Sequence, residues 1–422
     1  ATTNTDNTNT NIINTNTNTN TSISTNNYKQ SVVSLGVSAS MLSHLRDEFT
    51  GQKFADGPPS LSASIFDLSK IIKDTTAKWK CSFVERYQHN ASFVGEANAY
   101  VCHAWSNSWL YLIQALLSYA ESCGYTPFFW IDVLSLSQHS PMSRNIVPQL
   151  DVVMRNMSHM VLLGNPILSP LVRGRLWCHY EALLASQTLS KANVQVVTTV
   201  EDGLVFKKML VDDFQNISSR ILSKPYFGKP VATRQSDQRR LREVFSKHGG
   251  GRGAATIALR SMLALYIVDV VVASRVEFTD VSRLVAISCA TGNIVLKHNL
   301  MPHCVESMLL LLQAIEKLYT PQPTYADGVM LIKMCVLFGE WLAQSREMAQ
   351  AIKFLSHAHR IAISNSNGSN SYNNSNHNSR NNNNNNINND TTTTTNNNNT
   401  TTANNNNIII NNSSSNSSLP SF

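Results

Sequence analysis

Phe128-Phe129-Trp130-Ile131-Asp132-Val133 is the segment from which the fold class of this chain is inferred. It is rich in aromatic and β-branched residues and apolar but for Asp132, which is typical of a strand buried on both faces of a sheet. Further strand candidates are the apolar runs Tyr100–Cys102, Met160–Leu163 and Val194–Val200. Helix-length segments with an apolar stripe alternate with these runs at Trp109–Glu121, Leu150–Met157, Leu176–Leu189 and Leu204–Leu222. The alternation predicts βαβ units, and therefore an α/β fold with a parallel sheet covered by helices on both faces.

The chain beyond Thr256 has a different character and is predicted to be all α-helical. Helix-length segments with an apolar stripe lie at Ala255–Arg275, Val305–Leu318, Ala326–Leu342 and Glu347–Ile363. The most apolar stretch, Ala258–Val276, carries Arg260, Asp269 and Arg275. These charges favour a buried helix over a membrane span, and no membrane span is expected in the chain.

Both ends of the chain have a composition that does not support folding. Residues 1–27 and 364–422 consist mainly of Asn, Thr and Ser, and their only charged side chains are Asp6, Arg380 and Asp390. Such tracts lack the apolar side chains whose burial offsets the loss of chain entropy, so both are predicted to be disordered.

The region between these tracts is predicted to hold one α/β domain and one helical region. The sequence divides into a disordered tract (1–27), a partly helical N-terminal extension (28–98), the α/β domain (99–225), a basic, glycine-containing linker (226–253), the helical region (254–363) and a second disordered tract (364–422). In the extension, Leu61–Trp79 has the apolar period of a helix.

Part of the net charge of +7 lies between Arg234 and Arg252. One interpretation is a patch for nucleic acid or anionic lipid. An exposed connector is favoured instead, because no aromatic side chains for base stacking interleave with the basic ones. The glycine run Gly249–Gly251 supports a connector, and nucleic acid is therefore not an expected partner.

The seven cysteines are scattered and contain no CxxC pair. This argues against a disulfide framework and against a zinc ribbon, and reduced thiols favour a cytoplasmic location. A metal site of His103, His139 and His179 would need all three side chains to converge, and nothing in their spacing requires it. Neither a metal site nor a cofactor is expected.

Motifs of the predicted α/β domain resemble one protein family. Tyr100-Val101-Cys102-His103-Ala104-Trp105 looks like the opening strand of TIR (Toll/interleukin receptor) domains. Phe129-Trp130-Ile131-Asp132, with Ser135 and Gln138-His139 after it, resembles the second strand and loop of a divergent TIR-like group common in protists. Trp177-Cys178-His179-Tyr180-Glu181 matches the Trp-Cys-x-x-Glu motif that opens the third helix of plant-type TIR domains.

The resemblance covers about residues 99–222 and implies a flavodoxin-like parallel sheet. Two features depart from the family pattern. Cys102 stands where the family usually has Ser, and the loop after Asp132 is not the usual glycine-containing one. A fifth strand is not evident.

The end of the helical region, 335–363, resembles a tetratricopeptide (TPR) unit. Gly339, Leu342, Ala351, Leu355 and Ala358 fall near the consensus intervals. One such unit cannot bury its own faces and normally stacks on neighbours. The helical region is therefore expected to offer a groove to protein partners.

The resemblance also implies a candidate site. Some TIR domains hydrolyse NAD at the nicotinamide–ribose bond, and their key glutamate ends the motif, at Glu181 here. Such a carboxylate stabilises a cationic ribosyl transition state. Trp177 shares a helix face with Glu181, and His103, Trp105 and Asp132 would line the cleft at the C-terminal strand ends. Glu181 is thus the predicted catalytic residue, and the other four are predicted to bind substrate.

Each of these residues also has a plain structural interpretation. The alternatives are core packing for Trp177, a surface ion pair with Arg173 or Arg175 for Glu181, a loop cap for Asp132 and an ordinary loop position for His103. TIR adaptor domains keep the fold without the chemistry, so the fold alone does not establish the activity.

Two functions from different classes follow. The first is an intracellular signalling module that self-associates or recruits protein partners through the TIR-like domain and the TPR-like region. The second is an NAD glycohydrolase, with NAD as substrate and Glu181 as its carboxylate. The first ranks ahead because of the helical region and the divergent loop. A serine hydrolase is weaker, because no Gly-x-Ser-x-Gly elbow occurs.

Overall fold

The computed structural model describes residues 35–51, 63–139, 146–223, 230–232, 234–247, 250–318, 325–344, 346–347 and 349–363. All of them belong to one compact unit, residues 1–366. Both predicted disordered tracts, and part of the predicted linker, lie outside the described residues.

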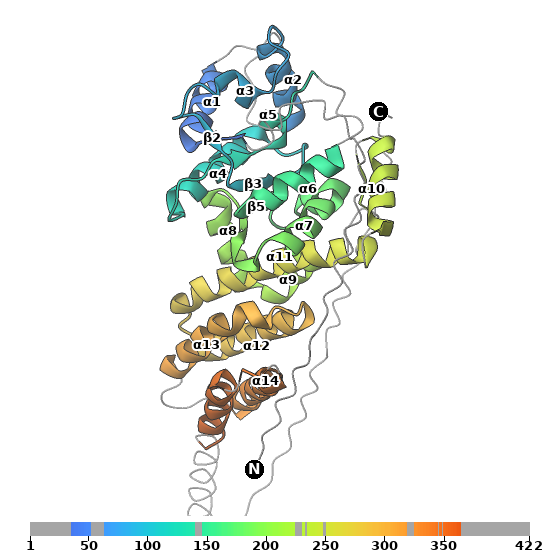
Figure 1. Ribbon diagram of the computed structural model, residues 1–422. Helices are drawn as coiled ribbons and strands as arrows, with labels where there is room; N and C mark the ends of the chain where they lie inside the picture. Colours follow the sequence, from blue (N-terminus) through green and yellow to red (C-terminus); the bar gives the residue numbers. More distant parts are fainter. Residues whose placement is uncertain are drawn as a thin grey trace, which may run out of the picture. The chain divides into compact units, whose positions relative to one another are not determined.

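A mixed sheet forms the centre of the N-terminal half (Figure 1). Within the described residues it has six strands in the order β2-β1-β4-β3-β5-β6. Their bounds are β1 (Leu35–Val37), β2 (Val94–Glu96), β3 (Ala99–Cys102), β4 (Phe129–Trp130), β5 (His159–Leu163) and β6 (Val194–Val197). The strands from β4 to β6 pair in parallel, whereas β1 pairs antiparallel with both β2 and β4.

The sequence thus predicts the parallel part of the sheet but not its other edge. The predicted strands at Tyr100–Cys102 and Met160–Leu163 are confirmed as β3 and β5, and Val194–Val200 is confirmed as far as Val197, where β6 ends. The predicted strand Phe128–Val133 is confirmed only at Phe129–Trp130 as β4, because Asp132 and Val133 already begin the short helix Asp132–Ser135. Strands β1 and β2 come from the N-terminal extension, where the sequence predicts no strand. They make the sheet mixed rather than wholly parallel.

The two faces of the sheet bury alternate side chains, as the period of a strand requires. Tyr100, Cys102, Met160 and Leu162 enter one hydrophobic core. Their neighbours Ala99, Val101, Val161 and Leu163 enter the other. Both sides of β3 and β5 are therefore buried, which explains why these strands are apolar without alternation.

Helices cover both faces. One core contains side chains from α1 (Ala39–Gly51), α2 (Ile65–Thr75), α3 (Phe83–Tyr87), α4 (Trp109–Ser122) and the short α5 (Asp132–Ser135). The other contains side chains from α6 (Ile146–Asn156), α7 (Leu176–Thr188), α8 (Val200–Asp212), α9 (Phe214–Leu222) and α10 (Gln235–Lys247). The predicted helix Leu204–Leu222 is two helices, divided at Asp213, whose carboxylate accepts a hydrogen bond from Asn216 N and caps α9.

Helix α10 lies within the segment predicted to be a linker. Its Leu241 and Phe245 are buried, and the Phe245 ring meets Tyr180 of α7 edge-on at 6.2 Å. The basic side chains of this segment therefore belong to an amphipathic helix packed on the α/β domain.

The predicted helical region is confirmed, with one helix more than expected. It comprises α11 (Gly251–Ser274), α12 (Val281–Lys297), α13 (Met301–Leu318), α14 (Tyr325–Gln344) and a last helix at 349–363. Helix α12 lies in a segment for which the sequence predicts no helix. Among the described residues, Gly251–Glu277 alone is long and apolar enough to cross a membrane. It packs on α7 from the α/β domain and on α12 and α13, as a core helix does (Figure 1).

The last two helices cross at a small residue. A Cβ atom added to Gly339 would lie 2.7 Å from Leu355 Cγ, and the rings of Phe338 and Phe354 meet edge-on at 5.5 Å. Glycine at position 339 therefore allows the two helices to approach closely.

Candidate functional site

A pocket of about 330 Å³ opens where β3 and β4 end. All the predicted site residues line it: His103, Trp105, Asp132, Trp177 and Glu181. The remaining lining residues are Phe66, Ser69, Lys70, Leu150, Arg175, Cys178, Arg234 and Asp237. The pocket thus combines residues from α2, the sheet, α6, α7 and α10.

The carboxylate of Asp132 holds the two strand-end loops together. Its Oδ2 accepts a hydrogen bond of 2.6 Å from Trp105 Nε1, and its Oδ1 accepts one of 2.6 Å from Val133 N. His103 Nε2 lies 3.0 Å from Oδ1 but without the alignment of a directed hydrogen bond, so this contact is an ion pair. Asp132 therefore caps the following turn, as one interpretation predicted, and also lines the pocket.

His103 and Asp132 stabilise each other's charged forms. Burial opposes ionisation of Asp132, but the charge of His103 and the hydrogen bonds of Trp105 and Val133 hold the pKa of Asp132 below its ordinary value. Burial also opposes protonation of His103, but the charges of Asp132 and Glu181 and the contacts with Asp132 and the Ala104 backbone together outweigh it and raise the pKa of His103. Since the His103 side chain is only 1% exposed, its charge acts mainly on Asp132 and Glu181.

One aromatic wall is fixed by the N-terminal extension. The backbone N–H groups of Ile65 and Phe66 donate to the carbonyl oxygens of Asn107 and Trp105, at 3.0 and 3.2 Å. These bonds satisfy donors in the first turn of α2 and tie that helix to the loop after β3. The ring of Phe66 then meets Trp105 edge-on at 5.4 Å.

Glu181 forms the floor of the pocket and is 8% exposed. Burial raises the pKa of Glu181 to about 7, and the charge of Asp132 acts in the same direction. Hydrogen bonds from Cys102 and Tyr100 and the charge of His103 oppose the rise. Its Oε2 atom is buried without a hydrogen-bond partner among the described protein atoms. The interpretation of Glu181 as half of a surface ion pair does not fit this burial.

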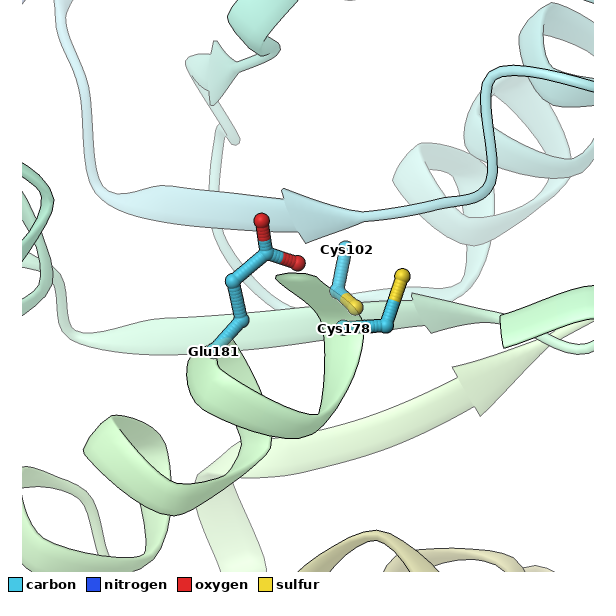
Figure 2. A group of neighbouring side chains, drawn as sticks. All are labelled: Cys102, Cys178 and Glu181. Carbon is cyan, nitrogen blue, oxygen red and sulfur yellow. The ribbon is translucent and has the colours of Figure 1, made fainter. Parts of the chain in front are cut away.

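Two thiols lie beside this carboxylate (Figure 2). Cys102 of β3, Cys178 of α7 and Glu181 bring a possible metal ligand atom each to within 4.8 Å of the others. Thiolate and carboxylate are ligands that zinc accepts. Burial raises the pKa of the Cys102 thiol. A hydrogen bond with Cys102 lowers the pKa of Cys178, but burial and the charges of Glu181 and Asp132 together outweigh it, so this pKa is raised as well. Protonated thiols can donate hydrogen bonds, and Cys178 Sγ donates one of 3.3 Å to the carbonyl oxygen of His103.

The histidines considered as metal ligands are apart from this cluster. His139 Nε2 lies 2.9 Å from Thr76 Oγ1, next to α2. His179 is buried between Arg173 O and Thr256 Oγ1. Within the described parts of the chain, neither joins a group of metal-ligand side chains with His103.

Comparison with models of known protein families, with curated proteins and with solved structures found no match. The case for a function therefore depends on the residues of the pocket.

Several lining residues escaped the sequence analysis. Phe66 and Lys70 belong to the extension, and Arg234 and Asp237 to the supposed linker. The sequence predicts a helix at Leu61–Trp79 and a basic linker. No local pattern in the sequence indicates that either segment contacts the ends of β3 and β4, where the pocket lies. Arg175 was considered only as a possible ion-pair partner of Glu181.

Proposed function

We propose that this chain is an NAD glycohydrolase of TIR-like type, which cleaves the nicotinamide–ribose bond with Glu181 as the key carboxylate. The single observation that carries the proposal is that Glu181 lies at the floor of a pocket whose walls include Trp105 and Trp177. Because of this observation the NAD glycohydrolase ranks ahead of the interaction module, whereas the sequence alone favours the interaction module. A buried carboxylate with an unpartnered oxygen is costly unless a ligand uses it.

The chemistry of the pocket suits a ribosyl transfer to water. An aromatic wall accepts the planar nicotinamide ring, which carries a positive charge in NAD. That charge favours the ionised form of Glu181, whose pKa of about 7 leaves both forms populated near neutrality. As the bond to nicotinamide breaks, the positive charge moves onto the ribose, and the carboxylate stabilises it. Water then adds to the ribose.

The sheet supports the family proposal. The order of the parallel strands, β4-β3-β5-β6, is the order 2-1-3-4 that begins a flavodoxin-like sheet. In such sheets ligands bind at the carboxyl ends of the strands, next to the point where the order reverses. The pocket lies at the ends of β3 and β4, beside that point.

The test is nicotinamide release from NAD by the purified chain, followed by chromatography at high protein concentration and with a crowding agent. Glu181→Gln is expected to lower the rate at least about 100-fold, the usual cost of removing a charge-stabilising group. Glu306→Gln, at an exposed position of α13, serves as the control and should leave the rate unchanged. Absence of release above buffer would refute the enzyme, and equal release by Glu181→Gln would refute the role of Glu181.

The interaction hypothesis is a second proposal, favoured by the surface of the last two helices. Met330 and Leu337, seven residues apart on α14, are 44% and 50% exposed, and Ile352 and Leu355 on the following helix are 58% and 41% exposed. Exposed apolar side chains on both helices are typical of surfaces that stack on a further repeat or a partner. Leu337→Glu with Ile352→Glu should abolish any self-association seen by sedimentation, and unchanged association would refute this surface.

A further inference from the structure

We propose that Arg234, together with Arg175 and the first turn of α7, forms a subsite for the diphosphate of the nucleotide, so that α10 completes the pocket from outside the α/β domain. This inference rests on the proposed function, because it names how the same pocket holds the rest of its substrate. The ligand chemistry is a nucleoside diphosphate linked to ribose.

The position of Arg234 is fixed by the chain before it. Val231 N donates to Gly174 O and Val231 O accepts from Leu176 N, both at 3.0 Å. This short bridge places residues 230–232 alongside Arg175 at the start of α7. Ala232 is buried in the core, so the backbone two residues before Arg234 is anchored.

The chain after Arg234 is anchored as well. Helix α10 begins at Gln235, and its Leu241 and Phe245 are buried against the α/β domain. Arg234 therefore stands between two fixed points, and its side chain lines the pocket with Arg175 and Trp177. The anchored backbone keeps the Arg234 side chain within reach of the pocket, and its planar guanidinium presents N–H donors in a fork that matches a phosphate.

The charges at the rim favour an anion. Lys70, Arg175 and Arg234 all line the pocket. Lys70 is paired with Asp67 at 3.0 Å, and no ion pair between described residues includes Arg234. Of the acidic lining residues, Asp132 is engaged by His103 and Trp105. Asp237 remains on the rim, where its carboxylate suits a ribose hydroxyl rather than a phosphate.

The start of helix α7 also favours an anion in the pocket. Its first turn lines the pocket through Trp177 and Cys178, and its N-cap, Arg175, makes no capping hydrogen bond with its side chain. Leu176 N is already bonded to Val231 O, but the helix dipole and the N–H groups of the next residues, Trp177 and Cys178, attract anions. The unpartnered Glu181 Oε2 one turn further along marks the same pocket as a ligand site. The floor thus takes the ribose that is cleaved, and the rim takes the phosphates.

The experiment measures binding of ADP-ribose and of nicotinamide riboside to the full chain carrying Glu181→Gln, by calorimetry, so that no hydrolysis is needed. Adding Arg234→Ala is expected to weaken ADP-ribose binding at least about tenfold, because a charge-assisted hydrogen bond to phosphate is lost. Nicotinamide riboside, which has no phosphate, should bind within twofold of its original affinity. Arg239→Ala, an exposed arginine on the same helix, is the matched control, and Arg234→Lys should recover part of the loss.

Three results would overturn the inference. They are unchanged ADP-ribose binding in Arg234→Ala, an equal loss for both ligands, and binding of inorganic pyrophosphate as tight as that of ADP-ribose, which would indicate a simple anion site. Because binding is read directly, the outcome is separate from that of the NAD hydrolysis assay. Arg234-dependent binding of ADP-ribose, together with no nicotinamide release from NAD by the wild-type chain, would support the subsite and refute the enzyme.

Discussion

Trp105 Nε1 donates a hydrogen bond of 2.6 Å to Asp132 Oδ2 and so joins the loop after β3 to the turn after β4. The other oxygen of Asp132 is held by Val133 N and by the charge of His103. Both oxygens of Asp132 are thus engaged within the protein, whereas one buried oxygen of Glu181 has no hydrogen-bond partner among the described residues. This difference supports a structural role for Asp132 and the catalytic role proposed for Glu181.

Replacing Trp105 by Phe tests the structural role of Asp132. The variant keeps an aromatic ring beside Phe66 but removes the N–H donor, so the free energy of unfolding should fall by about 1–3 kcal/mol, the usual range for a hydrogen bond to a charged group. The pKa of Asp132 should rise, because this bond helps to lower it. Urea unfolding measures the first effect and carboxyl NMR titration the second.

The control is Trp79→Phe, at a tryptophan that is 52% exposed. It should leave the unfolding curve almost unchanged, since a phenylalanine ring retains the stacking of Arg86 at 4.7 Å. A Trp105→Phe curve that coincides with the control would mean that the Trp105–Asp132 bond does not hold the two loops.

The sequence predicted those parts of the fold that rest on local pattern. Strands β3 and β5 are buried on both faces, so their apolar runs are unbroken, and helices such as α4 carry a regular stripe. Strands β1 and β2 have only three residues each, too few for a pattern to show. Gly36 also lies in β1, where an added Cβ would stand 2.8 Å from Phe129 O of β4. The close approach of the two strands therefore favours glycine at this position, although glycine is generally disfavoured in β-strands.

The site could be predicted in part, for a similar reason. His103, Trp105, Asp132, Trp177 and Glu181 follow strands or open a helix, and topology brings such positions together. Phe66 and Arg234 reach the pocket through long-range backbone pairing, of Phe66 N with Trp105 O and of Val231 with Gly174 and Leu176. No spacing in the sequence encodes such contacts.

Glu181 should make stability fall as pH rises. Its pKa is about 7 in the folded chain against 4.5 for the free group, so the folded state binds more protons between these values. The wild type therefore loses stability from about pH 4.5 through pH 7, by roughly 3 kcal/mol in all for this shift. Glu181→Gln cannot ionise, so its free energy of unfolding relative to wild type should increase over that range.

The measurement is a series of urea unfolding curves between pH 4 and pH 8, analysed as the difference between variant and wild type. Glu306→Gln on α13 provides the control and should give a difference curve without this rise. A flat curve for Glu181→Gln would contradict the burial of the carboxylate among Asp132, His103, Cys102 and Tyr100.

His179 should have the opposite effect on the pH dependence of stability, which should fall as pH falls. Burial lowers the pKa of His179 to about 4, and the charges of Arg252, Arg260 and Arg173 add to the effect, although the hydrogen bond with Arg173 O opposes it. The folded chain therefore resists protonation, and stability is lost as pH falls from 6.5 through about 4, again by roughly 3 kcal/mol.

His179→Gln should remove this acid-induced loss, which is read as a difference curve against wild type in the same urea series. The variant is also expected to be less stable at pH 8, because the contacts of the ring with Arg173 O at 2.9 Å and Thr256 Oγ1 at 3.2 Å are disturbed. A difference curve that does not change between pH 7 and pH 4 would show that His179 is not enclosed between α7 and α11.

Gly292→Ala tests the packing of the helical region. Gly292 lies in α12, and an added Cβ would stand 2.8 Å from Phe338 Cζ of α14, with Met334 close behind. Phe338 is fully buried and meets Phe354 edge-on, so its ring has little room to move. The strain of overpacking, about 1–3 kcal/mol, should exceed the gain of up to about 1 kcal/mol from replacing a helical glycine, and the variant should be destabilised.

Gly253→Ala is the matched control, because Gly253 also lies in a helix and an added Cβ there meets no atom within 4 Å. It should stabilise the chain slightly or leave it unchanged, so the two substitutions are expected to shift urea unfolding in opposite directions. Stabilisation by both would mean that α12 and α14 are less closely packed than the structure has them. The surface proposed for partners, which α14 shares with the last helix, would then lack a rigid base.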